Sequence, residues 1–243
     1  MQNKATIITT LIISFMLMST TLFYASSASC SHHKRHLRIP THIRLPVITQ
    51  SESDNKWDVN PRVWNLALKA YNNAMQKGYI KQKVVTIIDY SLPSSVKRMW
   101  VVDVGNKKVL YHTLVAHGKF TGGLFAKHFS NKPGSRASSI GTFITENTYM
   151  GSNGYSLRLR GLEPGFNERA ESRAIVVHGA WYATQNFASH HGRLGLSWGC
   201  PAVSPLLAKP IINHIKNGTL VFAYYPDTQW LEHSRFLAAN SMG

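Results

Sequence analysis

The sequence predicts a mainly β domain, a sandwich or barrel with a few peripheral helices, preceded by one separate helix. Short runs of β-branched and aromatic residues, separated by turn residues, fill residues 81–226, and this pattern is typical of such folds. Few segments have a helical pattern. The chain has 243 residues, of which 44% are hydrophobic and 11% aromatic. This suffices for one sizeable domain or two small ones with a buried core, and it argues against gross disorder.

Residues 1–29 have the pattern of a secretory signal peptide. Lys4 is followed by an apolar run from Ile7 to Tyr24 and then by small residues, which is the order that such signals share. We expect cleavage near Ser27 to Ser29. Because the run is long enough to span a bilayer, an uncleaved N-terminal anchor stays open. Lipidation at Cys30 is a further alternative, although no leucine stands three residues before it.

Residues 30–56 are expected to form a basic, flexible linker. The segment is polar, basic and punctuated by proline, and it has neither a helical nor a strand period. Its histidines could chelate a metal, but a solvated basic linker is the favoured interpretation of such a run. These histidines are His32, His33, His36 and His42.

An N-terminal helix is expected within residues 57–80. Asp58 or Asn60 before Pro61 is a helix start signal, and Gly78 is a stop signal. Residues at helical spacing form one apolar face, which we expect to pack against the domain that follows. They are Val63, Ala67, Ala70, Tyr71 and Ala74.

The domain proper is assigned to residues 81–226, and residues 227–243 are assigned to a C-terminal tail. A hairpin is expected from Met99 to His117, with its turn at 105–108. The segment 205–218 has a helical pattern that Pro210 interrupts. Outside the hairpin, strands are expected at 84–90, 139–151, 155–162, 174–178 and 219–226.

The chain is strongly basic, with a formal net charge of +16 from 27 Lys and Arg against 11 Asp and Glu. An exported protein does not meet nucleic acid, so the nearer partners for this charge are anionic membrane lipids and the carboxylate-bearing polymers of a cell wall. A solvated surface tuned for solubility is the alternative. Between Leu92 and Ile140, Asp103 alone opposes a series of basic residues: Lys97, Arg98, Lys107, Lys108, Lys119, Lys127, Lys132 and Arg136.

Cys200 is the one cysteine beyond the N-terminal region, so the chain has no disulfide framework. A cysteine nucleophile needs a base to form its thiolate and backbone N–H groups aimed at the developing oxyanion. Gly199 lets the backbone bend beside Cys200, and the N–H groups of both residues can point into a site. His178 ends an expected strand, and Gly179 beside it permits a turn. His178 is therefore the candidate base.

The segments "VVHGAWY" and "GRLGLSWGCPAVS" resemble the catalytic core of the bacterial L,D-transpeptidases, the YkuD-like fold, and in particular its divergent murein branch with "GCPAV" after the histidine strand. The stretch "SIGTF", Ser139 to Phe143, resembles the family's strand that carries G-x-F. The resemblance covers about Val84 to Tyr225. It implies an enzyme that acts on peptidoglycan stem peptides. Together with the export signal, this places the expected enzyme in the periplasm or cell envelope. No cofactor or metal is expected, and a monomer is the default.

Carried onto this sequence, the resemblance implies that Cys200 is the nucleophile and His178 its base. Ser197 would orient the site through hydrogen bonds, and Gly199 with Cys200 would supply the oxyanion N–H groups. The thiolate would attack the third residue of a stem tetrapeptide and release D-Ala. The resulting thioester would then pass to an amine, giving a cross-link, or to water.

Two residues depart from the commoner family pattern. Trp198 and Ala202 stand where that pattern has His and Arg. Arg193 is the candidate replacement for the missing arginine, with a surface role as the alternative. Trp198 is either a platform for sugar or peptide or packing for its loop. Gly179 can allow the close approach of a substrate. Gly179, Arg193 and Trp198 are assigned to substrate binding.

Three other interpretations stay open. A Cys–His murein peptidase or carboxypeptidase would use the same pair with water as acceptor, but papain-like enzymes place the cysteine before the histidine. A basic cell-wall-binding module would have a merely buried cysteine. A zinc site at Cys200 with His178, His190 or His191 is disfavoured by the irregular spacing and the lack of a second nearby cysteine.

Overall fold

The computed structural model describes residues 57–238. The expected signal peptide (1–29) and linker (30–56) lie outside the described residues, as do residues 239–243. Within the described range, no helix is both long and apolar enough to cross a membrane.

Helix α1 spans Pro61–Gln76 and begins as the sequence predicts. The side chain of Asn60 accepts a hydrogen bond from the Arg62 N–H at 2.9 Å, which satisfies one of the free N–H groups of the first turn. Gly78 follows the helix with a φ of 71°, a left-handed conformation that favours glycine. The expected apolar face is buried in the core.

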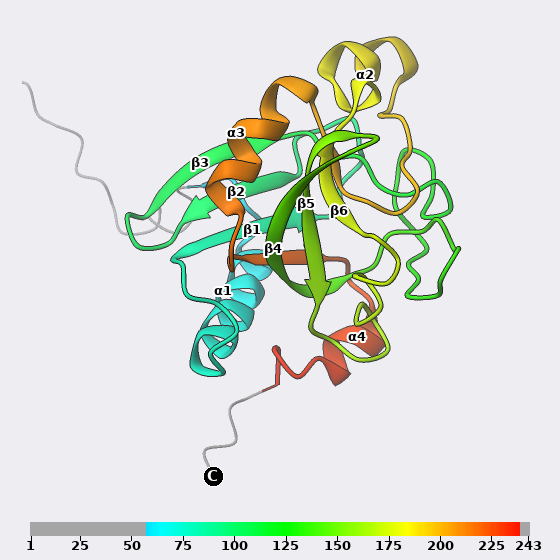
Figure 1. Ribbon diagram of the computed structural model, residues 1–243. Helices are drawn as coiled ribbons and strands as arrows, with labels where there is room; N and C mark the ends of the chain where they lie inside the picture. The colour runs from blue at the N-terminus through cyan, green and yellow to red at the C-terminus, as the bar shows by residue number, and fades with distance from the viewer. Residues whose placement is uncertain (1–56, 239–243) are drawn as a thin grey trace, which may run out of the picture. The chain divides into compact units, whose positions relative to one another are not determined.

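The mainly β class is confirmed, because eight strands form one mixed sheet in the order β3-β2-β1-β8-β4-β5-β6-β7. Two neighbouring pairs, β1 with β8 and β6 with β7, are parallel, and the others are antiparallel. Figure 1 shows the strands between the helices. The strands are β1 (Val84–Asp89), β2 (Met99–Asp103), β3 (Lys108–Thr113), β4 (Gly141–Gly151), β5 (Gly154–Gly161), β6 (Val176–Gly179), β7 (Ala202–Val203) and β8 (Leu220–Tyr224).

A hydrophobic core lies on each of the two faces of the sheet. Successive strand residues point to opposite faces, and in β8 Leu220 and Phe222 enter the core under α1, whereas Val221 and Ala223 enter the core under helix α3 (Pro205–Ile215). Because both faces are covered, strands such as β8 are buried along their whole length.

Helix α3 is continuous through Pro210, which we expected to interrupt it. Proline lacks the N–H that would bond to the carbonyl of Leu206. Leu206 is 87% exposed, so water can satisfy that carbonyl. The buried face of Ile211, Ile212 and Ile215 holds the helix on the sheet.

The C-terminal segment that we assigned to a tail is part of the domain up to residue 238. Helix α4 (Thr228–His233) begins with the Asp227 side chain accepting from the Trp230 N–H at 2.8 Å. Trp230 and Phe236 are fully buried in the same core as α1. The sequence pattern misses this docking because the segment is short and has only isolated apolar residues.

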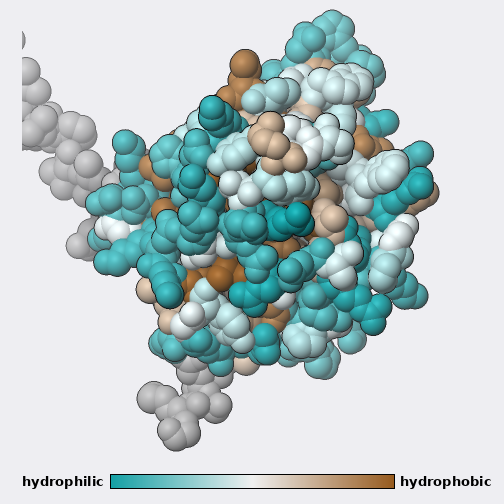
Figure 2. All heavy atoms as spheres, viewed as in Figure 1, coloured by the Kyte–Doolittle hydropathy of each residue, from teal (hydrophilic) through white to brown (hydrophobic). Residues whose placement is uncertain are grey.

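A second short helix, α2 (Gln185–His191), follows a 3-10 turn, η2 (Trp181–Ala183). The Thr184 side chain accepts from the Phe187 N–H at 3.2 Å, and Gly192 ends α2 in a left-handed conformation. Figure 2 shows a largely hydrophilic face of the molecule on which apolar residues form only small, separate patches.

Candidate active site

The parallel pairing of β6 with β7 brings the two halves of the site together. His178 lies opposite Ala202 in the register of this pair, and Cys200 precedes Ala202 by two residues. On the other side of β7, the Ala116 N–H donates to the Ala202 carbonyl at 2.8 Å. His178 and Cys200 thereby line one cavity, 22 residues apart in the sequence.

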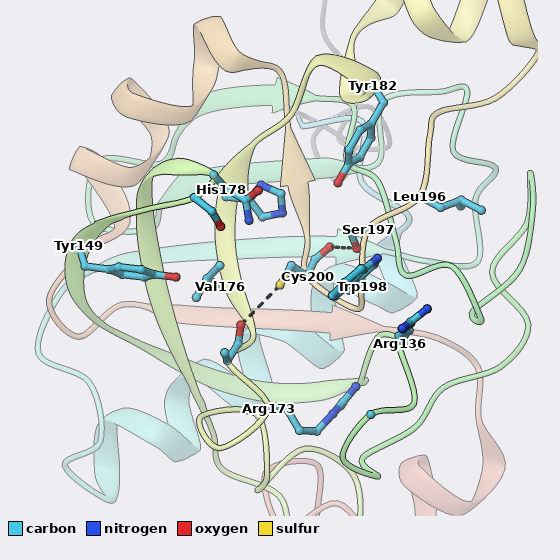
Figure 3. A pocket seen from close by; sticks show the side chains of 14 residues that line it. Arg136, Tyr149, Arg173, Val176, His178, Tyr182, Leu196, Ser197, Trp198 and Cys200 are labelled. Atoms are coloured by element: carbon cyan, nitrogen blue, oxygen red, sulfur yellow. Dashed lines mark hydrogen bonds between the residues drawn. The ribbon is translucent and has the colours of Figure 1, made fainter.

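This cavity has a volume of about 740 Å³. Figure 3 shows His178, Cys200 and Ser197 along one part of it, with Arg136, Arg173 and Trp198 nearby. None of the described residues that line it is acidic. The lining residues are Gly134, Arg136, Tyr149, Ser152, Asn153, Arg173, Ala174, Val176, His178, Tyr182, Leu196, Ser197, Trp198 and Cys200.

The Ser197 side chain holds the loop of residues 197–200, which we call the cysteine loop, in a fixed conformation. Its hydroxyl donates to the Cys200 carbonyl at 2.6 Å and accepts from the Gly199 N–H at 3.1 Å. Its own backbone is fixed from outside the loop, since its N–H donates to the His117 carbonyl at 3.0 Å. The geometry therefore fits the orienting role expected for Ser197. It also corrects one expectation, because the Gly199 N–H is already bonded and does not serve as an oxyanion donor here.

Gly199 occupies a position that only glycine can fill. Its φ is 118°, outside the range of ordinary L-residues. A Cβ atom at this position would lie 2.8 Å from the Ala137 carbonyl oxygen. The tight approach of the cysteine loop to the segment around Ala137 depends on this missing side chain.

Cys200 is partly buried, and its sulfur lies 3.6 Å from the Ala174 carbonyl, to which the thiol donates. Burial raises the pKa of the Cys200 thiol, while a hydrogen bond from the Val176 backbone and the charge of Arg173 act against this rise. The resting group at neutral pH is consequently a thiol that needs a base before it can attack.

His178 is suited to be that base. It is 3% exposed, and its Nδ1 lies 3.0 Å from the Gly179 carbonyl. Because a carbonyl only accepts hydrogen bonds, Nδ1 carries the proton and Nε2 keeps its lone pair. Burial lowers the pKa of His178, so the ring is neutral at physiological pH and free to accept a proton.

Two arginines line the cavity, and neither is the one we expected. Arg193 lies outside the lining residues, and its guanidinium donates to the Leu194 carbonyl at 2.8 Å. Ala202, which stands where the commoner pattern has arginine, is fully buried in β7 and lies outside the lining residues. The lining cations are Arg136 and Arg173.

Arg173 joins two loops beside Cys200. Its guanidinium donates to the Ser130 carbonyl at 2.7 Å, the Ser139 hydroxyl at 2.6 Å, the Ser135 hydroxyl at 3.0 Å and the Ala137 carbonyl at 2.6 Å. All of these acceptors are neutral, and no carboxylate of residues 57–238 forms an ion pair with Arg173. The guanidinium therefore contributes a positive potential at the cavity.

Trp198 forms part of the surface and does not pack inside its loop. The side chain is 70% exposed, and the Arg136 guanidinium carbon lies 4.6 Å from the centre of its ring system, a cation–π geometry. The platform interpretation of Trp198 fits this exposure better than the packing interpretation.

The remaining expected site residues lie elsewhere. Gly179 is outside the lining residues, and a Cβ there would approach the Ala208 Cβ to 3.0 Å, so its small size serves the packing of α3. His190 and His191 end α2, and both are exposed. Across residues 57–238, no group of three or more His, Cys, Asp or Glu is arranged to hold a metal ion.

Sequence comparison matches residues 55–224 to the family model of the L,D-transpeptidase catalytic domain. No curated protein matches the chain.

Solved structures with a similar arrangement include an L,D-transpeptidase from Mycobacterium smegmatis, which is 15% identical, with 59% of each chain covered and a TM-score of 0.39. L,D-transpeptidase 1 from Mycobacterium tuberculosis is 16% identical over 59% of this chain and 62% of its own, with a TM-score of 0.32. The helical cell shape determining protein of Campylobacter jejuni is 10% identical over 62% of this chain and 50% of its own, with a TM-score of 0.40. The match thus spans less than two thirds of the length of each of these proteins.

Proposed function

This chain belongs to the L,D-transpeptidase catalytic domain family, and we propose that it is an exported enzyme that modifies peptidoglycan through an acyl-thioester on Cys200. The observation that carries the proposal is the cavity shared by Cys200 and a neutral, buried His178, with the Ser197 hydroxyl bonded to the Gly199 N–H and the Cys200 carbonyl.

The first half of the reaction is acylation. His178 Nε2 takes the thiol proton, and the Cys200 sulfur attacks the carbonyl carbon of the third residue of a stem tetrapeptide. The Cys200 N–H donates to the oxyanion that develops. When the tetrahedral intermediate collapses, the amide bond breaks and the protonated His178 returns its proton to the amine of the leaving D-Ala.

The second half releases the enzyme. An amine of another stem peptide attacks the thioester carbonyl, His178 accepts its proton, and the thiol of Cys200 re-forms with that proton. Water in place of the amine would give carboxypeptidase activity by the same steps. Two acyl transfers in series allow a new amide bond to be made without an external energy source.

The charge of the cavity supports an anionic substrate. Stem peptides carry free carboxylates, and the described residues that line the cavity include Arg136 and Arg173 but no acidic residue. Arg173 is engaged by the surrounding loops. Arg136, exposed and stacked on Trp198, is the cation best able to pair with a substrate carboxylate.

We further propose that residues 1–29 direct export to the periplasm or cell envelope, as a cleaved signal or a retained anchor. The basic excess of the chain is suited to weak adhesion to an anionic membrane or wall surface. The enzyme is taken to act as a monomer.

The test is mass spectrometry of residues 30–243 incubated with disaccharide-tetrapeptides. A dimer that has lost one D-Ala would identify transpeptidation, and a monomer that has lost D-Ala would identify hydrolysis. Cys200→Ala should abolish either product, and Cys30→Ala, which removes the other cysteine, should not. Activity retained in Cys200→Ala would refute the thioester route. If no product forms and iodoacetamide does not modify Cys200, a wall-binding module becomes the better interpretation.

A further inference from the structure

We infer that Ser138 is a positioning residue that sets the direction of the Cys200 N–H for acyl transfer. The inference rests on the proposed function, in which Cys200 is acylated. Ser138 belongs to the segment that enters β4 and is distant from Cys200 in the sequence.

Ser138 is only 1% exposed and bonds to the peptide that carries the Cys200 N–H. Its hydroxyl donates to the Gly199 carbonyl at 2.9 Å and accepts from the Gly118 N–H at 3.0 Å. Its backbone N–H donates to the Thr121 hydroxyl at 2.7 Å. These bonds fix both the position of Ser138 and the direction of its hydroxyl.

The Gly199 carbonyl and the Cys200 N–H belong to the same peptide unit. That unit is trans, since the described residues contain no cis peptide bond, and in a trans peptide the C=O and N–H point in opposite directions. A hydroxyl that holds the carbonyl on one side therefore fixes the N–H on the other. The φ of 118° at Gly199 leaves this peptide without the restraint of regular secondary structure.

The Cys200 N–H is also free to donate to an oxyanion. The Gly199 N–H is bonded to the Ser197 hydroxyl at 3.1 Å. Within the described part of the chain, the Cys200 N–H forms no hydrogen bond with another residue. An oxyanion at the carbonyl attacked by the sulfur can therefore accept a hydrogen bond from the N–H of Cys200 itself.

A network of interactions that includes the buried cation Arg98 extends to Ser138. The Tyr90 hydroxyl interacts with the Ser138 side chain, and the Arg98 guanidinium carbon lies 5.2 Å from the centre of the Tyr90 ring. Arg98 is itself fully buried, with bonds of 2.9 Å to the Val115 carbonyl and 2.7 Å to His117 Nδ1. Because the His117 carbonyl accepts the Ser197 N–H, the network reaches both Ser138 and Ser197.

Two chemical probes separate this role from a general effect on the site. With p-nitrophenyl acetate, the Cys200 sulfur bonds to the carbonyl carbon, an oxyanion develops, and p-nitrophenolate leaves. With iodoacetamide, the sulfur displaces iodide from a CH₂ carbon, and no oxyanion forms. Ser138→Ala should lower the acylation rate constant about 10- to 100-fold, while the alkylation rate and its pH profile stay unchanged.

The controls use the same chain, residues 30–243. Ser234→Ala removes another buried serine hydroxyl, bonded to the Phe236 N–H beyond α4, and both rates should remain at wild-type values. Tyr90→Phe keeps the ring but removes the hydroxyl that faces Ser138. It should lower acylation to a smaller extent and leave alkylation unchanged, which keeps the inference testable if Ser138→Ala does not fold.

Equal losses of acylation and alkylation in Ser138→Ala, or acylation at the wild-type rate, would overturn the inference. The proposed function fails in a different way. If p-nitrophenyl acetate acylates Cys200→Ala as fast as wild type, or if wild type forms no product from disaccharide-tetrapeptides, the thioester route is wrong whatever Ser138 does.

Discussion

Acidification is expected to destabilise the fold through one buried side chain, His117, which is fully excluded from solvent. Its Nδ1 lies 2.7 Å from an Arg98 nitrogen and its Nε2 lies 3.1 Å from the Gly122 carbonyl. Since Arg98 only donates, the neutral ring must accept at Nδ1 and donate at Nε2. A second proton, on Nδ1, would face the Arg98 charge directly.

Burial, together with the charge of Arg98, lowers the pKa of His117 from 6.5 to about 4. The unfolded chain takes up this proton near the ordinary value, so between pH 6.5 and pH 4 the unfolded state binds more protons than the folded state. The free energy of unfolding therefore falls as the pH falls. A shift from 6.5 to about 4 corresponds to about 3 kcal/mol at about 1.4 kcal/mol per pH unit.

Urea unfolding followed by tryptophan fluorescence across this pH range would measure the loss. Two other groups also titrate: burial lowers the pKa of His178, which adds to the loss, and burial raises the pKa of Asp89, which opposes it. His117→Gln keeps an acceptor for Arg98 but cannot be protonated, so the difference between the variant and the wild type isolates His117. If the two show the same dependence of stability on pH, the reasoning is wrong.

Four further outcomes follow from the site and the core. The rate of Cys200 alkylation by iodoacetamide should still be rising at pH 9, because burial holds the thiol pKa above its ordinary value of 9.0; a plateau below that pH would contradict this. Gly199→Ala should stop acylation and lower the free energy of unfolding by about 1–3 kcal/mol, measured by urea titration, because the new methyl group would strain the backbone. Arg136→Ala should raise KM for disaccharide-tetrapeptides about tenfold and leave kcat unchanged, whereas a fall in kcat alone would argue against carboxylate binding. Trp230→Phe should cost about 2 kcal/mol of stability in the same titration, because Glu163 loses a buried donor at 2.9 Å.

Local patterns were sufficient to predict most of the elements and to select two candidate residues, Cys200 and His178, that line one cavity. The apolar face of α1 and the alternation within β8 follow directly from residue spacing, and Cys200 and His178 were identified from the glycines around them and the expected strand end. These are properties of neighbouring residues, which a sequence displays directly.

The cavity residues that the sequence did not indicate come from segments that meet only in the folded domain. Arg136 and Arg173 reach the cavity from two loops that meet only when β4, β5 and β6 are assembled. Arg193 seemed the better candidate because it is close to Cys200 in the sequence, yet its guanidinium bonds to the neighbouring backbone. Proximity along the chain is a poor guide to side-chain direction in a loop. The expected interruption of helix α3 at Pro210 was wrong because the cost of a proline depends on whether the freed carbonyl is exposed to water. The sequence does not display that exposure.

The docking of α4 affects how this domain should be produced in the laboratory. The family match ends at residue 224, and a protein truncated there would lack Trp230 and Phe236. Phe222, which contacts Trp230 with 5.5 Å between ring centres, would then face water, along with the apolar side of α1. Such a protein is expected to be insoluble or to require refolding, whereas an expression boundary at or beyond residue 238 keeps this surface covered.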